Sequence, residues 1–315
     1  MISPASPIVT RFAPSPNGWL HLGHAYSAIL NHEVARLLGG RFLLRIEDID
    51  PERSRPEFET AIYRDLDWLG LSWEQPVRRQ SEHLATYRGA LSRLQERGLA
   101  YPAFMSRSEI AAAVAVAGPS WPTDPDGTPH YPSRDRDMRP GEVADRLAAG
   151  AQFTVRLNTA RSTEFAGRLT WRELAATGWN EQSATPDKWG DVILGRRDVP
   201  ASYHLAVVID DAGQGVTHII RGGDLAAATS VHRLLQGLLS LPTPHYCHHE
   251  LVVDDRGVKL SKSASAQGLH QLRAQGITAA ALRARLAVDR EAARVAEAIT
   301  RSSGGQKAPM QKGSS

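Results

Sequence analysis

The apolar residues of this chain fall into short runs and into longer stretches with helical spacing. Residues 8–12 form a short apolar run, residues 25–38 repeat apolar side chains at helical spacing until Gly39-Gly40, and residues 41–46 form a second run. Periodic spacing predicts a helix, and the short runs predict buried strands. The chain therefore begins with a strand, a turn containing Pro and Gly, a helix and another strand.

The same two patterns continue along the chain. Helical spacing predicts helices at 57–69, 82–97 and 226–239 and one or two helices within 276–295, and a run of small residues predicts a helix at 111–117. Apolar or strand-like runs predict strands at 152–157, 190–194, 205–209 and 216–220. The run at 205–209 is apolar throughout, which is typical of a strand buried on both faces of a parallel sheet. Trp68 and Trp73 are expected to pack in the core.

Composition and charge narrow the class of protein. The 315 residues are 42% apolar, which is ample for a large core in one domain or two. The net charge of +3, with 37 Lys and Arg, permits a nucleic-acid partner without requiring one. No apolar run suits a membrane helix, the first residues lack a targeting pattern, and a single cysteine, Cys247, excludes an internal disulfide. We therefore expect a cytoplasmic protein that does not associate with membranes.

Candidate chemistry begins in the turn between the first strand and the first helix. A helix start presents free backbone N–H groups and the positive end of the helix dipole, which suit an anionic phosphate. His21 and His24, three residues apart at this start, can project toward one ligand. Taken alone, the pair is weak evidence for a site and more often belongs to a capped helix with two surface histidines.

A second cationic stretch lies far downstream. Residues 259–263 read Lys-Leu-Ser-Lys-Ser and follow a turn after the apolar residues 251–253. Two lysines and two hydroxyls on a short loop can bind a polyphosphate. The alternative for this stretch alone is a solvated basic loop.

Together the two stretches resemble the paired nucleotide-binding motifs of class I aminoacyl-tRNA synthetases. His21-Leu-Gly-His24 is similar to the family's His-Ile-Gly-His pattern, and residues 259–263 are similar to its Lys-Met-Ser-Lys-Ser pattern. The resemblance implies binding of ATP and Mg²⁺, with catalysis by His21, His24 and Lys262. The ATP-binding residues it implies are His21, Gly23, His24, Lys259, Ser261 and Lys262.

The resemblance also implies an α/β fold: a Rossmann-type parallel sheet with an inserted α+β module and a short C-terminal helical segment. Residues 118–139 are rich in Pro, Asp and Gly, which indicates irregular backbone within the insertion. We expect the first half of the nucleotide-binding core at 1–100, the insertion at 101–188, the second half at 189–250, the lysine motif and helices at 251–300, and a disordered polar tail at 301–315. In the family the insertion receives the acceptor end of tRNA.

Two further stretches resemble the glutamate- and glutamine-specific members. They are Arg-Phe-Ala-Pro-Ser-Pro at 11–16 and Arg-Ile-Glu-Asp-Ile-Asp-Pro at 45–51, and Arg-Gly-Gly-Asp-Leu at 221–225 fits the same group. The resemblance implies a glutamate site made by Arg11, Ala13, Ser15, Glu47, Tyr203 and Arg221. A guanidinium can hold a carboxylate through two hydrogen bonds, and a carboxylate can receive an ammonium group. Asp50 could instead cap a helix, and Arg221 could instead pair with Asp224.

Metal ions bound by the protein's own side chains are not expected. Relatives often bind zinc in the insertion through a Cys-x-Cys after a Tyr and a later Tyr-x-x-x-Cys, but residues 101–105 and 131–135 contain no cysteine. We predict that zinc is absent and that Phe104, Met105 and Trp121 order the insertion by apolar packing. The resemblance implies that the histidines at 245–249 lie on the strand that leads to the lysine motif. Successive side chains of a strand face opposite ways, so we expect no metal there either.

The length after the lysine motif indicates the subclass. Glutamyl- and glutaminyl-tRNA synthetases continue into an anticodon-binding domain, for which the remaining residues are too few, and this resembles the stand-alone glutamyl-Q tRNA(Asp) synthetases. That subclass forms glutamyl-adenylate and transfers glutamate to queuosine in the anticodon of tRNA(Asp); a monomer is expected. Three alternatives stay open: a truncated synthetase charging tRNA(Glu), a nucleotidyltransferase making another adenylate, and a non-catalytic RNA-binding relic.

Overall fold

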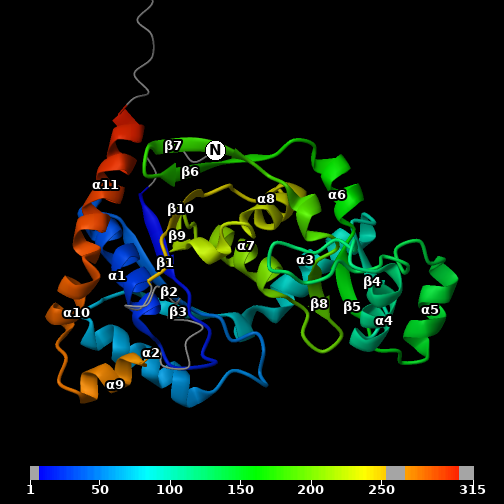
Figure 1. Ribbon diagram of the computed structural model, residues 1–315, viewed down its shortest axis with the longest axis horizontal. Helices are drawn as coiled ribbons and strands as arrows, with labels where there is room; N and C mark the ends of the chain where they lie inside the picture. Colours follow the sequence, from blue (N-terminus) through cyan, green and yellow to red (C-terminus); the bar gives the residue numbers. More distant parts are fainter. Residues whose placement is uncertain (1–6, 253–266, 305–315) are drawn as a thin grey trace, which may run out of the picture.

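The computed structural model describes residues 7–252 and 267–304. The fold is built around a central layer of mostly parallel strands. One group is β1 (Val9–Phe12), β2 (Arg41–Ile46) and β3 (Glu74–Arg79); the other is β9 (His218–Gly222), β10 (His245–His249) and β6 (Thr170–Ala175), with antiparallel β7 (Gly178–Ser183) beyond β6. Thr217 joins the groups, because its N donates to Val9 O over 3.0 Å and its Oγ1 accepts from Val9 N over 2.8 Å. The layer therefore runs β3-β2-β1-β9-β10-β6-β7 (Figure 1).

Helices cover both faces of this layer. One face carries α1 (Leu22–Leu37), α2 (Pro56–Trp68), α9 (Leu269–Ala274), α10 (Ala279–Leu286) and α11 (Val288–Gly304), and the other carries α3 (Leu84–Glu96), α7 (Tyr203–Gly213) and α8 (Thr229–Leu238) (Figure 1). The first hydrophobic core contains side chains of α1, α2 and α11 together with Phe42, Leu44 and Ile46 of β2. Leu43 packs into a different core on the other face of β2, as the alternation of a strand requires. Trp68 and Trp73 pack against the first core, as expected. The α/β architecture predicted from the sequence is confirmed.

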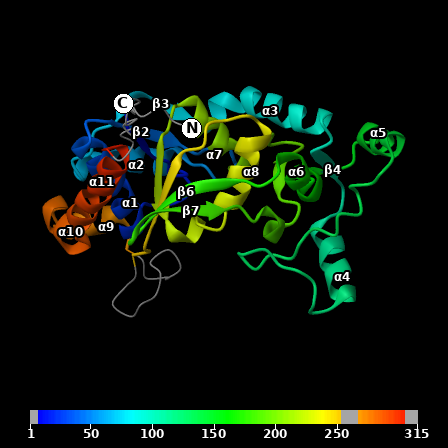
Figure 2. The same ribbon diagram turned by 90° about the horizontal axis from the view of Figure 1, so that it is seen from above.

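A second group of elements projects from one end of the central layer (Figure 2). It contains the antiparallel strands β4 (Ala100–Ala103), β5 (Thr154–Leu157) and β8 (Ile193–Arg196) and the helices α4 (Arg107–Ala117), α5 (Pro140–Ala148) and α6 (Thr159–Ala166). Short 3₁₀ turns lie at Gln80–His83, Pro186–Trp189 and Gly223–Leu225.

One predicted strand, β8, and one strand that was not predicted, β6, depart from the expected arrangement of the sheet. The parallel sheet was expected to resume at 190–194, but β8 pairs antiparallel with β5 instead. Conversely, β6 comes from the expected insertion yet pairs with β10 in the central layer. Strand pairing therefore crosses the expected boundary between 188 and 189, and the division of the chain into domains stays a prediction.

The largest correction concerns residues 205–209, which belong to helix α7 and not to a strand. Every residue from 205 to 211 is buried, so the helix is enclosed on all sides and shows no polar face. An apolar run without periodicity cannot distinguish a buried strand from a buried helix. Ser202 before the run and Gly213 at its end were the available helix signals.

The C-terminal segment folds as helices to residue 304. Ala287 takes a left-handed conformation, with φ of 47°, and separates α10 from α11, so the region predicted as one or two helices contains two. The tail predicted from 301 is wrong for residues 301–304, which continue α11; Arg301 donates to Glu297 one turn earlier. Residues 305–315 lie outside the described part. No helix in the described ranges is long and apolar enough to cross a membrane.

Candidate active site

A pocket lies at the carboxyl ends of β1 and β9, where the strand order of the layer reverses. Open α/β sheets place their ligand sites at such a point. The pocket has a volume of about 470 Å³. Nine predicted site residues line it: Arg11, Ala13, Ser15, His21, Gly23, His24, Glu47, Tyr203 and Arg221. The other three, Lys259, Ser261 and Lys262, lie outside the described residues.

The two histidines cap helix α1 and face the pocket. His21 is the N-cap residue and its Nδ1 accepts from Gly23 N over 3.1 Å, while His24 Nδ1 accepts from His21 N over 3.2 Å. Their rings stack with centroids 3.8 Å apart. Because each Nδ1 is an acceptor, each ring carries its proton on Nε2. Both readings of the sequence therefore hold at once: the histidines cap a helix and line a pocket.

Burial keeps these imidazoles uncharged. It lowers the pKa of His21, with Asp224 opposing the shift, and lowers the pKa of His24 to about 3, with His21 adding to the effect. Gly23 allows the arrangement, because a Cβ there would lie 3.1 Å from Cε1 of His21. The pocket thus offers neutral N–H donors beside the N-terminus of a helix, which suits a phosphate group.

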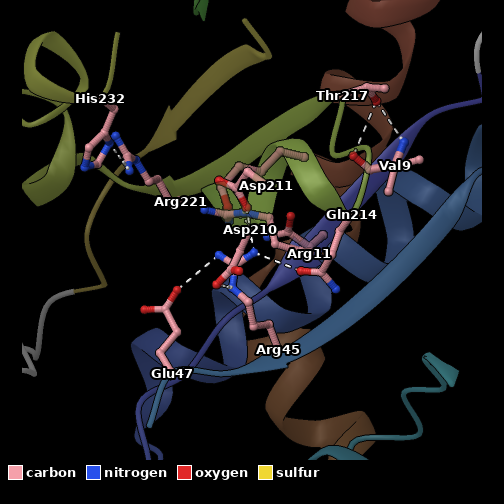
Figure 3. A network of polar contacts seen from close by, with 12 residues as sticks. Val9, Arg11, Arg45, Glu47, Asp210, Asp211, Gln214, Thr217, Arg221 and His232 are labelled. Carbon is pink, nitrogen blue, oxygen red and sulfur yellow. Dashed lines mark hydrogen bonds and ion pairs between the residues drawn. The ribbon is translucent and has the colours of Figure 1, made fainter. Parts of the chain in front are cut away.

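A buried network of charges adjoins the pocket, which Arg11 and Glu47 of the network line (Figure 3). Asp211 of α7 accepts from Arg11 Nε over 3.2 Å and from Arg45 Nη1 over 2.7 Å. Arg45 also donates to Glu47 over 3.1 Å through Nη2. No described residue accepts from Nη1 or Nη2 of Arg11, which lines the pocket. Arg11 is therefore held by its Nε, with both terminal nitrogens left for a ligand.

The surroundings shift the pKa values of Asp211 and Glu47 in opposite directions. Burial alone would raise the pKa of Asp211, but Arg11 and Arg45 together lower it below its usual value. Burial raises the pKa of Glu47, and Arg45 and Arg11 only partly offset this. The neighbouring Asp210 accepts from Arg78, Gln80 and Tyr87. Neither aspartate was predicted as a site residue, because at the end of a strand the two would face opposite sides, whereas on helix α7 both face the network.

Arg221 is not the sheet-edge residue paired with Asp224 that one reading of the sequence allowed. It is 4% exposed and lines the pocket. Its Nε donates to His248 Nε2 over 3.1 Å and its Nη2 donates to Thr229 Oγ1 over 2.8 Å. Within the described ranges no carboxylate lies within 4.0 Å of it.

A second pocket of about 340 Å³ adjoins the first. Ser15, Asn17, Glu47 and Tyr203 line both, so the two spaces meet at these side chains. Asp50 lines the second pocket and lies 3.6 Å from Arg196 of β8. Helix α2 begins later, with Arg55 as its N-cap residue, so Asp50 does not cap that helix.

At the positions where the family resemblance implies zinc-binding cysteines, the insertion has Ala103, Met105 and Asp135. Ala103 and Met105 pack in a small apolar cluster, and Asp135 accepts from Phe104 N over 2.7 Å and from Tyr131 OH. A carboxylate already used by two donors, without a thiolate nearby, does not fit zinc. Hydrogen bonds to Asp135 therefore order this region together with apolar packing.

Two further features of the insertion bear on the packing expected from the sequence. Phe104 contacts Phe153, as ring centroids 6.1 Å apart show, and Trp121 donates to His130 O.

Among the described residues, no group of three His, Cys, Asp or Glu could hold a metal, and this includes the histidines of β10.

Comparison with known proteins places this pocket in context. The family model described as tRNA synthetases class I (E and Q), catalytic domain, matches residues 7–302. A glutamyl-Q tRNA(Asp) synthetase of Rhodobacter capsulatus is 47% identical over 283 residues, covering 88% of this chain and 98% of that protein. A glutamate–tRNA ligase of a Synechococcus strain is 38% identical over 278 residues, covering 86% of this chain but 56% of the ligase.

Solved structures agree with the fold. A glutamate tRNA ligase from Elizabethkingia meningosepticum, described as in complex with its amino acid, superposes with a TM-score of 0.64 at 26% identity, over 80% of this chain and 52% of that one. A glutamate–tRNA synthetase from Elizabethkingia anophelis gives a TM-score of 0.65 at 25% identity, over 86% and 54%. The chain thus spans about half the length of these ligases.

Proposed function

This chain belongs to the family of class I tRNA synthetases for glutamate and glutamine, and from that premise we propose that it activates glutamate with ATP and transfers it to queuosine in the anticodon of tRNA(Asp). The observation that carries the proposal is the pocket itself. It combines neutral N–H donors at a helix N-terminus with two guanidinium groups, Arg11 and Arg221. The 47% identity to a glutamyl-Q tRNA(Asp) synthetase over nearly its whole length supports the acceptor.

In the activation step a glutamate carboxylate attacks the α-phosphate of ATP and pyrophosphate leaves. Catalysis here consists of positioning and charge stabilisation, since no protein base is needed. His21 and His24 would donate Nε2–H to phosphate oxygens, while Arg11 and Arg221 hold the amino acid. Ser15, Glu47 and Tyr203 lie at the junction of the two pockets, where the activated carboxyl group has to meet its acceptor. The second pocket provides room for that acceptor.

The lysine motif is assigned the leaving pyrophosphate. The described residues that flank it lie at the pocket: Leu251 and Val252 line it, and Leu269 N donates to Leu20 O just before His21. We assign Lys259, Ser261 and Lys262 to the pyrophosphate because the family resemblance implies it and because described residues before and after the motif lie at the pocket. Mg²⁺ bound together with ATP would neutralise charge on the phosphates.

Transfer of labelled glutamate tests the proposal. Purified tRNA(Asp) with and without queuosine is compared with tRNA(Glu), in the presence of ATP and Mg²⁺. Labelling only of queuosine-containing tRNA(Asp) is expected. Labelling of tRNA(Glu) instead would establish the second candidate, a synthetase that charges tRNA(Glu), which the 38% identity to a glutamate–tRNA ligase favours. No labelling, and no ATP–pyrophosphate exchange with glutamate, would indicate a non-catalytic RNA-binding protein.

A further inference from the structure

Every N–H group of the buried Arg221 guanidinium has an acceptor, and every acceptor is uncharged. Besides His248 and Thr229, Nη1 donates to His232 Nδ1 over 3.2 Å and more weakly to Tyr203 OH over 3.4 Å, and Nη2 donates to Leu225 O over 3.2 Å. A buried guanidinium normally pairs with a carboxylate. Here the nearby carboxylates Asp211 and Glu47 are bound to Arg11 and Arg45 instead.

The hydrogen bonds define the protonation of the histidines around Arg221. Arginine can only donate, so His232 Nδ1 must accept and the ring carries its proton on Nε2. That Nε2 lies 3.2 Å from Nδ1 of His204 and donates to it (Figure 3 shows His232 against Arg221). His248 Nε2 likewise accepts from Arg221, so its Nδ1 donates to Glu173 Oε1 over 2.9 Å. Both rings turn their N–H groups away from the guanidinium.

The surroundings keep these imidazoles neutral. Burial lowers the pKa of His232 well below its usual value, and Arg221 lowers it further. Burial and Arg221 also lower the pKa of His204 to about 4. For His248, burial outweighs the opposing effect of Glu173 and lowers the pKa. The histidines therefore accept from Arg221 without neutralising or repelling its charge.

The two sides of the guanidinium differ. His232, His248 and Thr229 do not line the pocket, whereas Tyr203 and Leu225 do. The bonds from the pocket side include the longest one, to Tyr203, so a ligand carboxylate can replace it at little cost. Resting on the proposed function, we infer that His232 and His248 are positioning residues that select an anionic amino acid. They hold Arg221 through uncharged acceptors, so its positive charge is compensated only by a substrate carboxylate.

A matched pair of variants separates the charge of the acceptor from its presence. In His232→Asn the side-chain oxygen replaces Nδ1 as a neutral acceptor, and His232→Asp has the same shape with a negative charge. Glutamate-dependent ATP–pyrophosphate exchange should show a KM for glutamate raised at most about threefold by Asn and more than about tenfold by Asp, because the carboxylate of Asp would already compensate the positive charge of Arg221 that the substrate carboxylate otherwise compensates. The kcat of the two variants should differ by less than about threefold. Both variants lose the bond to His204, so that loss cancels.

Equal KM values for the two variants would overturn the inference, as would a difference confined to kcat. His248→Gln and His248→Glu form a second pair with the same expectation and replace the first if either variant fails to fold by circular dichroism. Exchange by the wild-type protein distinguishes a failure of the proposed function from a failure of this inference. No exchange in wild type overturns the proposed function and this inference with it, whereas exchange in wild type with equal KM values overturns the inference alone.

Discussion

His24 performs two tasks with the two nitrogens of one ring. Nδ1 accepts from His21 N and completes the cap of α1, and Nε2 is left to donate into the pocket. Burial, with His21 adding to the effect, lowers its pKa to about 3, so the ring is neutral near pH 7. The stability of the helix start and the chemistry of the pocket thus depend on different atoms of the same residue.

The two tasks can be separated by substitution. His24→Asn keeps an acceptor near the position of Nδ1 and removes the Nε2 donor, so we expect the exchange rate to fall about 10²–10³-fold. Its free energy of unfolding should stay near that of wild type. His24→Ala removes both atoms and should lose a similar factor in rate and a further 0.5–2 kcal/mol or so of stability. An Asn variant with the wild-type rate would contradict the donor role.

At the scale of elements, an ion pair links helix α1 to the C-terminal helix α10. Glu33 of α1 accepts from Arg36 over 2.7 Å and from Arg283 of α10 over 2.7 Å, and its side chain is 8% exposed. Burial opposes ionisation, but the bonds from Arg283 and Arg36 lower the pKa of Glu33 to about 2. The C-terminal segment therefore supports the helix whose first turn forms the pocket.

Replacing Glu33 with Gln should lower the free energy of unfolding at pH 7 by about 1.5–3 kcal/mol, the usual contribution of hydrogen bonds to a charged group. The pKa of Glu33 is lower in the folded chain, about 2, than its ordinary value of 4.5, so ionisation stabilises the fold above that ordinary value. This stabilisation disappears as the pH falls from about 4.5 toward 2. Urea unfolding of both proteins at pH 7 and pH 3 measures it.

Glu291→Gln provides the control for that experiment. Glu291 pairs with Arg294 three residues later on α11, at a more exposed position. A partly exposed pair within one helix is worth at most about 1 kcal/mol. If Glu33→Gln cost no more than this control, or if its cost did not shrink at low pH, the link between α1 and α10 would be of little consequence.

At the scale of the whole molecule, Arg45 connects parts of the chain that are far apart in sequence. Its side chain is fully buried, and its partner Asp211 lies 166 residues away in α7. It also binds Glu47 and Gln214 (Figure 3). One guanidinium thus joins strand β2 to helix α7, and through Glu47 it contacts the lining of the pocket.

Arg45→Met should lower the free energy of unfolding by about 3–5 kcal/mol, because it leaves buried carboxylates without their partner. Arg41→Met is the matched control on the same strand, since Arg41 pairs with Glu74 while both side chains are more than 40% exposed. That surface pair should contribute about 1 kcal/mol or less. Urea unfolding of the three proteins tests the difference, and equal losses would refute the role of Arg45.

The helix and strand patterns that open the chain were predictable because they are local. Residues 25–38 repeat apolar side chains at helical spacing, and α1 forms there; residues 41–46 form the strand expected of them. The motifs carrying His21, Arg11, Glu47 and Arg221 identified side chains that the fold brings to one pocket. The absence of cysteine in the insertion likewise followed from the sequence directly.

Tertiary structure decided the rest. Helix α7 has no periodicity because it is buried on every side, so only its neighbours could distinguish it from a strand. Asp211, Asp135 and His232 gained their importance from partners distant in sequence or hidden behind the pocket. By itself the sequence determined which side chains were available and which local segments would be helical or extended. Which charges are neutralised and which are left for a substrate depends on the packing of segments remote in the chain, because ion pairs form between neighbours in space.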